Sequence, residues 1–161
     1  MAMKTIPNLA LPLLLGAAIF IAAPSVRAHE GHHHRFSAGE PGNPNKPART
    51  VKVSMEEQGK KLFFEPGRII VRKGEQIRFV LFNDGTESHE FVLATVRENL
   101  RHAKFMKTHP HMKHRDPNAV TLTAFSGGML LWKFTKRGTF EYGCLIPGHR
   151  KAGMHGTIVV E

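Results

Sequence analysis

The segment "RIIVRKGEQIRFVLFNDG", residues 68–85, sets the fold that we expect for this chain. Apolar and polar side chains alternate on both sides of a turn at Lys73-Gly74, which is the pattern of strands with one buried face. We therefore predict two strands joined at that turn. The side chains predicted to point inward are Ile69, Val71, Ile77, Phe79 and Leu81.

The same alternation recurs in other short segments of the chain. They are "TVKVS" from Thr50, "HEFVLAT" from His89, "MLLWKFT" from Met129, "GTFEYGC" from Gly138 and "GTIVVE" at the end. Short strands separated by turns predict an all-β fold, a Greek-key β-sandwich or small barrel. The further inward side chains are predicted to be His89, Phe91, Leu93, Leu130, Trp132, Phe134, Phe140, Tyr142 and Cys144.

One segment has helical rather than strand periodicity. In "TVRENLRHAKFMKTHP", Thr95 and Glu98 have the spacing of a capping box. Val96, Leu100 and Ala103 then recur at helical intervals, and Pro110 limits the far end. We predict one helix over residues 96–108, inserted between strands.

The first residues have the features of a secretory leader. Lys4 precedes an apolar run without acidic residues, and "VRA" offers a small-residue cleavage site after Ala28. We expect residues 1–28 to be removed and the protein to be periplasmic. An uncleaved membrane anchor over residues 5–23 stays open, although Pro7 and Pro12 interrupt that run. We expect a His-rich flexible tail and linker over residues 29–49, with little order before Thr50, and one domain over residues 50–161.

Charge and cysteine content restrict the partners and the chemistry. The chain has a formal net charge of +10, which falls to +8 without Lys4 and Arg27 of the leader. Export argues against a nucleic-acid partner, so we expect either an acidic protein, an anionic membrane surface, or no partner at all. A single cysteine in an oxidising compartment cannot form an internal disulfide. The thiol must therefore be buried, paired with another chain, or occupied chemically, for example by a metal–thiolate bond.

The stretch "YGCLIPGHRKAGMHG", residues 142–156, contains that cysteine. Strand alternation directs Cys144 inward, His149 and Met154 follow in a loop, and His89 points inward at the start of another strand. Two imidazoles, one thiolate and an axial thioether form the ligand set of a blue-copper site. Zinc is less well matched, because Met is a poor zinc ligand. The alternative is a buried inert cysteine beside an unrelated histidine and methionine.

From these residues, the segment 50–161 resembles the cupredoxins, the family of plastocyanin and azurin. "FEPGRIIVRKGEQIRF" from Phe64 matches the strand signature of the family, and the ligand-loop spacing is similar to that of rusticyanin and auracyanin. The whole segment also resembles periplasmic cupredoxins linked to copper tolerance. The resemblance implies one type 1 copper held by His89, Cys144, His149 and axial Met154. It also implies electron exit at an exposed edge of His149, ringed by Leu145, Ile146, Pro147 and Ala152.

One residue departs from the family pattern. Many members have Asn directly after the first His ligand, whereas this chain has Glu90. Alternation points the side chain of Glu90 away from the copper, as a surface carboxylate. The absence of the Asn leaves open the reduction potential and the rigidity of the site, since groups around the ligands set both.

Two further clusters could bind additional copper weakly. The first, in "HEGHHH", offers His29, His32, His33 and His34. The second, in "HAKFMKTHPHMKH", offers His102, Met106, His109, His111, Met112 and His114. The alternatives are a solvated tail and a helix with a core methionine and surface histidines. We expect His155 to be a surface residue.

The sequence supports one leading function and two alternatives. The leading hypothesis is a monomeric, redox-active copper protein without a transmembrane segment after leader cleavage, acting in copper tolerance, in electron transfer or in both. Its partner would be an acidic cytochrome or copper protein. A copper enzyme with Cu(I) oxidase or reductase activity is the first alternative, but Cys144 lies between Gly143 and Leu145 without a flanking histidine to serve a second copper centre. A binding module without redox activity is the second.

Overall fold

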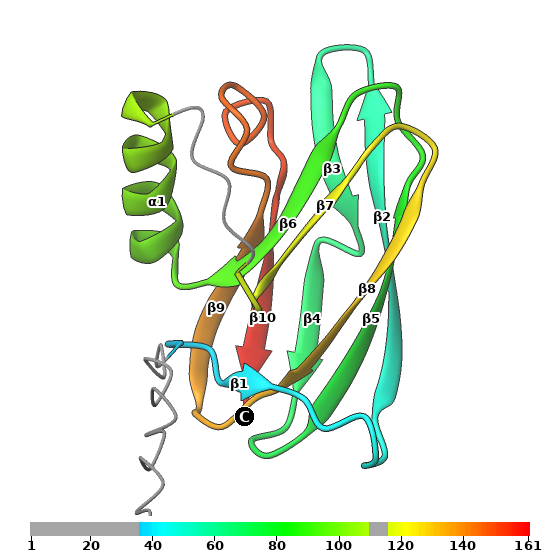
Figure 1. Cartoon of the computed structure of the whole chain (residues 1–161), viewed down its shortest axis with the longest axis vertical. Helices are drawn as coiled ribbons and strands as arrows, with labels where there is room; N and C mark the ends of the chain where they lie inside the picture. The colour runs from blue at the N-terminus through cyan, green and yellow to red at the C-terminus, as the bar shows by residue number, and fades with distance from the viewer. Residues whose placement is uncertain (1–35, 110–115) are drawn as a thin grey trace, which may run out of the picture. The chain divides into compact units, whose positions relative to one another are not determined.

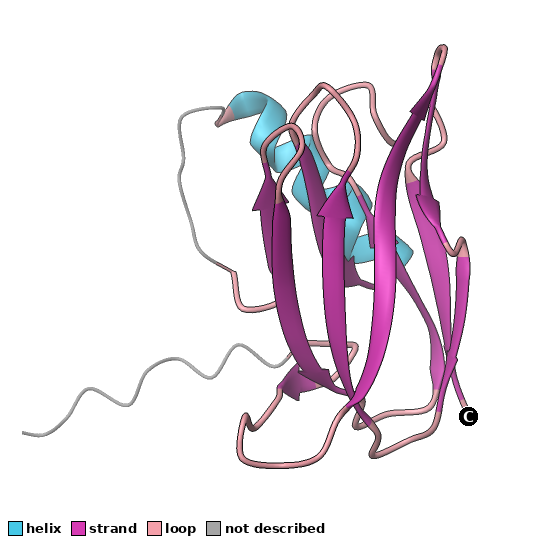
Figure 2. Cartoon of the chain, turned by 90° about the vertical axis from the view of Figure 1, so that its right-hand side faces the viewer, coloured by secondary structure: helices cyan, strands magenta, loops and turns pink. Residues whose placement is uncertain are grey.

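The computed structural model describes residues 36–109 and 116–161. They form two five-stranded sheets that face each other (Figures 1 and 2), which confirms the predicted sandwich. The first sheet has the order β1 (Glu40–Pro41), β8 (Gly127–Lys133), β5 (Gln76–Asn83), β2 (Arg49–Gln58) and β3 (Lys61–Glu65). The second has the order β4 (Arg68–Val71), β10 (His155–Val160), β9 (Gly138–Gly143), β6 (His89–Ala94) and β7 (Ala119–Leu122).

The turn at Lys73-Gly74 joins the two sheets rather than two neighbouring strands. Gly74 has a φ of +87°, a conformation that favours glycine. β4 pairs in parallel with β10, whereas β5 pairs in parallel with β2. The alternating side chains of both strands therefore point into the space between the sheets, where Ile69, Val71, Ile77, Phe79 and Leu81 are buried as predicted.

Large aromatic side chains fill the middle of the sandwich. Phe91 stacks on Tyr142 with ring centroids 5.2 Å apart, and Phe64 meets both rings edge-on. Burying such side chains supplies most of the driving force for folding. The other inward residues predicted on β6, β8 and β9 are buried as well. This packed centre is the rigid base on which the ends of β6 and β9 are held.

The predicted helix forms over the predicted residues, and it docks through a polar side chain. α1 spans Val96–Thr108, and Thr95 and Glu98 close the capping box. Its buried residue is Asn99, whereas Val96 and Leu100 are about half exposed. The apolar positions Val96 and Leu100 are therefore not the main contact of the helix. Asn99 donates instead to the carbonyl of Val92 and to the buried carboxylate of Glu141, which attaches α1 to β6 and β9.

The segment before β2 differs from the flexible linker that we expected. β1 pairs with β8, and Ala38 is completely buried. Phe36 packs edge-on against Trp132, whose indole N–H donates to the carbonyl of Ala38. Pro and Gly residues mark turns in this segment, but they do not prevent it from packing. The order therefore begins well before Thr50.

The predicted leader and the tail cluster His29, His32, His33 and His34 lie outside the described residues, as do His111, Met112 and His114. Within the part of the chain that is described, no helix has the length and apolar character that crossing a membrane requires.

Candidate metal centre

His89 is held at one end of the sandwich, as the first residue of β6. It is fully buried and follows a turn that is organised by the buried side chain of Asn83. The amide of Asn83 donates to the carbonyls of Glu87, Leu122 and Thr123, and its oxygen accepts from the N–H of Gly85. Sequence reasoning missed Asn83, because two of its partners, Leu122 and Thr123, lie 39 and 40 positions away in the chain.

The other predicted ligands come from the end of β9 and the loop that leads to β10, at the same end of the sandwich as the start of β6 (Figure 1). The backbone N–H of Cys144 donates to the carbonyl of Met154 over 3.1 Å, and the N–H of Met154 donates to the carbonyl of His149 over 3.1 Å. These bonds fold the loop back on itself. They explain how residues five and ten positions apart reach one point.

Three of the predicted ligands meet there. The Nδ1 atoms of His89 and His149 lie 3.1 Å apart, and the Sγ atom of Cys144 lies 3.5 Å from Nδ1 of His149. All three ligand atoms lie within 4.8 Å of one another. Among the described residues, this is the only such group of three or more His, Cys, Asp or Glu side chains.

The chemistry of this donor set fits copper. Two imidazole nitrogens and one thiol sulfur face a common point that is shielded from water, which suits both Cu(I) and Cu(II). Met154 is fully buried, and its backbone is bonded to both Cys144 and His149, which places it beside the cluster as the predicted axial ligand. The residues present therefore fit a type 1 site.

The sulfur of Cys144 has a backbone partner despite the departure at position 90. The N–H of Glu90 donates to Sγ over 3.4 Å, so this contact does not require an Asn side chain. Burial raises the pKa of the Cys144 thiol to about 11. A metal ion that binds there must displace the proton, since the thiolate is the metal ligand.

Each histidine has a carboxylate on its outer nitrogen, which the sequence did not predict. Nε2 of His89 lies 3.1 Å from Oε1 of Glu57, and Nε2 of His149 lies 3.2 Å from Oε2 of Glu87. The N–H of Glu87, followed by hydrogen bonds from Thr86 and His89, lowers the pKa of Glu57 to about 2. Burial, and then the nearby His89, lowers the pKa of His149.

The edge of His149 is less open than we expected. Its exposure is 9%, and the carboxylate of Glu87 lies at Nε2. Of the apolar ring around it, Leu145 is buried, Ile146 and Ala152 are half-buried, and Pro147 is exposed. An approach from solvent to His149 therefore passes the carboxylate of Glu87 as well as apolar side chains.

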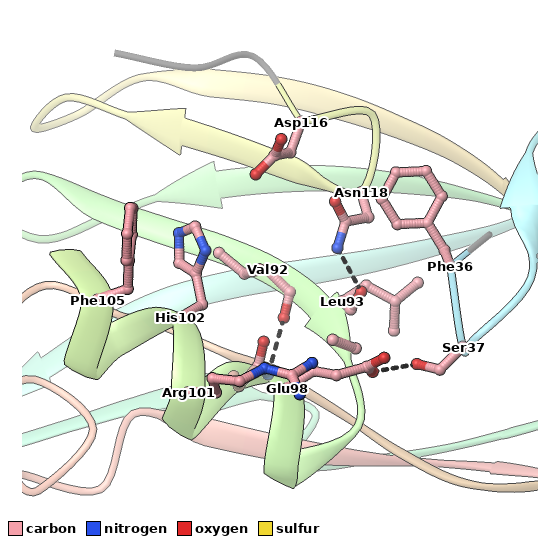
Figure 3. A pocket seen from close by; sticks show the side chains of 12 residues that line it. Phe36, Ser37, Val92, Leu93, Glu98, Arg101, His102, Phe105, Asp116 and Asn118 are labelled. Carbon is pink, nitrogen blue, oxygen red and sulfur yellow. Dashed lines mark hydrogen bonds between the residues drawn. The ribbon is translucent and has the colours of Figure 1, made fainter. Parts of the chain in front are cut away.

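The helix cluster is only partly described. His102 and Phe105 project from α1 into a pocket of about 460 Å³ against β6, opposite Asp116 and Asn118 (Figure 3). His109 is exposed at the end of the helix, where it stacks on Phe105 with ring centroids 4.1 Å apart. Met106 is half-buried. Copper binding by this cluster stays a prediction.

Comparison with known proteins agrees with this geometry. Residues 51–161 match the copper-binding proteins of the plastocyanin/azurin family. The chain is 42% identical to the copper-resistant cuproprotein CopI of Rubrivivax gelatinosus over 92% of this chain and 94% of that protein. It is 30% identical to CopI of Pseudomonas aeruginosa over 96% and 98% of the two chains.

A solved structure shares the fold. Auracyanin from Roseiflexus castenholzii superposes with a TM-score of 0.59 and 17% identity, over 72% of this chain and 99% of that one. The chain belongs to the plastocyanin/azurin family of copper-binding proteins, and His89, Cys144 and His149, with Met154 beside them, form its type 1 copper site.

Proposed function

We propose that this protein is exported to the periplasm and acts there in copper resistance as a redox-active copper protein. The main support is the match to a copper-resistant cuproprotein along nearly the whole of both chains. The four-ligand set is complete in this chain, so the proposed role does not require another subunit to supply a ligand.

The protein residues in this proposal hold the metal and keep water away from it. Bound copper would supply one-electron chemistry by alternating between Cu(I) and Cu(II). His89 and Cys144 sit at the ends of packed strands, and both are fully buried. A rigid frame keeps the ligand positions similar in the two oxidation states, which makes electron movement fast. The same burial limits the exchange of copper with solvent.

The proposed partner is an acidic redox protein, either a cytochrome or another copper protein, that meets a monomer of this chain. The net positive charge supports an acidic partner rather than nucleic acid. Electrons would pass at the His149 edge, the ligand nearest the surface. Mixing experiments at rising salt test this proposal, because charge-guided association slows as ions screen it. A rate independent of salt would count against an acidic partner.

The proposed export has a direct test. The proposed leader over residues 1–28 predicts a mature protein that begins at His29 and has no transmembrane segment. N-terminal sequencing of the protein from a periplasmic fraction checks this directly. A chain that starts at Met1 and stays with the membrane would support the anchor instead.

We propose that the protein binds copper and transfers electrons and that it does not catalyse a reaction of its own. Cys144 lies between Gly143 and Leu145, so no histidine beside the thiolate leads to a second copper centre. Purified, copper-loaded protein should therefore show no catalytic oxidation of Cu(I) and no reduction of nitrite. Turnover of either substrate, lost in Cys144→Ala, would establish the enzyme hypothesis.

Growth under copper stress tests the proposed role. Deletion of the gene should raise copper sensitivity, and the wild-type gene should restore growth. A Cys144→Ala gene should fail to restore it, whereas a His155→Ala gene, changed at an exposed position of β10, should succeed. Equal growth of the deletion strain and its parent would contradict a role in resistance.

A further inference from the structure

A carboxylate from another strand lies behind the first histidine ligand. Glu57 is near the end of β2, and its Oε1 atom lies 3.1 Å from Nε2 of the fully buried His89. The opposite nitrogen, Nδ1, faces His149. The two nitrogens of His89 thus have separate partners: one side belongs to the metal site, and the other belongs to Glu57.

The position of Glu57 is fixed by the turn before His89. Its carboxylate accepts the backbone N–H of Glu87 over 3.0 Å and the hydroxyl of Thr86 over 2.9 Å. The same turn makes room for it at Gly85, where a Cβ atom would lie only 2.2 Å from Oε1. Two hydrogen bonds and one close approach by a glycine therefore place a carboxylate at Nε2 of this ligand.

The carboxylate on the second histidine is held differently. Glu87 is 64% exposed at its side chain, whereas Glu57 is 21% exposed. The side chain of Glu87 approaches Nε2 of His149 from the surface. Exposed pairs of this kind contribute little, because solvent screens them. Of the two contacts, the one at His89 has the fixed geometry that can orient a ligand.

We propose that Glu57 is a positioning residue of the copper site, which keeps the proton of His89 on Nε2 and directs Nδ1 toward the metal. A carboxylate bonded to the outer N–H of a ligand histidine fixes its tautomer and makes the ring a stronger donor. Its negative charge also favours Cu(II) over Cu(I), since the oxidised ion carries the larger positive charge. Glu57 therefore lowers the reduction potential. The inference rests on the type 1 site and not on the role in copper resistance.

Two variants separate the charge of Glu57 from its contact. Glu57→Gln removes the charge and keeps a side chain of nearly the same shape. Gly85→Ala keeps the charge, but its added Cβ forces the carboxylate away from its present place. Glu56→Gln is the matched control, because it removes one charge from the neighbouring residue of the same strand, whose side chain points to the other face of the sheet.

The measurements are the reduction potential of the copper-loaded full-length mature protein and the NMR signal of the His89 ring in the metal-free protein. We expect Glu57→Gln and Gly85→Ala both to raise the potential above the wild-type and Glu56→Gln values. We also expect a slowly exchanging Nε2–H signal of His89 in the wild type, which both variants weaken. Loss of the coloured site in a folded Glu57→Gln protein would likewise support the positioning role.

Equal potentials in Glu57→Gln, Glu56→Gln and the wild type would overturn the proposal. A potential raised in Glu57→Gln but unchanged in Gly85→Ala would also overturn it, because the charge would then act without the contact. A wild-type protein that forms no coloured copper complex would refute the copper site itself, which is a separate failure.

Discussion

The two regions rich in histidine and methionine differ in how their side chains are held. At the end of the sandwich, His89 begins β6 and His149 lies in the loop after β9, and both have partners at both ring nitrogens. On α1, His102 borders a pocket, and His109 stacks on its own helix in contact with solvent. Residue type is similar in the two regions, but among the described residues only the first has ligands that long-range packing brings together. That difference predicts one strong site and, at most, weak binding elsewhere.

The largest expected effect separates the two regions directly. His149→Ala removes one of three clustered ligand atoms, so we expect loss of the intense thiolate-to-copper absorption band. His109→Ala should leave the band unchanged, because that exposed residue lies on the helix. Visible absorption after addition of one equivalent of Cu(II) measures both variants. A band that survives His149→Ala would contradict the assignment of the strong site to the end of the sandwich.

The next effect concerns the support of His89. Asn83→Ala removes an amide that donates to three carbonyls in a buried position. We expect the free energy of unfolding to fall by about 2 kcal/mol, since buried carbonyls lose their donor. Denaturant titration of the metal-free protein measures this change. Asn45→Ala, at an exposed turn position, is the control and should stay near the wild-type value.

A smaller effect tests how α1 is attached. Asn99→Ala removes the bonds to Val92 and Glu141 and should cost about 1 kcal/mol of unfolding free energy. Leu100→Ala, at a half-exposed position, should cost less. The copper absorption band should be the same in both variants. If Leu100→Ala were the more destabilising change, the apolar stripe would be the docking face after all.

The smallest effect concerns weak binding by the helix. A His102→Ala, His109→Ala double variant should take up less copper beyond the first equivalent, because two imidazoles are removed. Isothermal titration calorimetry with Cu(II) measures the uptake, and the first equivalent should bind as in the wild type. Unchanged uptake beyond that equivalent would exclude these two residues from any weak site.

Local sequence patterns predicted the parts of the molecule that depend on neighbours in the chain. Alternation placed Phe79 and Trp132 inward, and the Thr95–Glu98 spacing gave the correct helix start. Cys144 and His149 could be predicted as ligands because their spacing in the chain is typical of a copper-binding loop. His89 could be predicted because strand alternation directs its side chain inward at the start of a strand.

The parts that sequence reasoning missed depend on contacts across the fold. Glu57 lies 32 positions before His89 and meets it only because β2 and the turn before β6 end at the same place. β1 lies in a segment rich in Pro and Gly that has no strand pattern of its own. It becomes a strand because it pairs with β8, which is distant in the chain. Asn99 gave no apolar signal, since it attaches α1 through hydrogen bonds.

We conclude that one copper ion binds at the cluster of His89, Cys144 and His149. A Cu(II) titration followed by visible absorption and electron paramagnetic resonance tests it, with the mature wild type beside Cys144→Ala. We predict an intense thiolate-to-copper band that saturates at one equivalent and is absent from the variant. Colourless uptake by the wild type, with no such band, would contradict the claim and assign the copper to the histidine-rich segments instead.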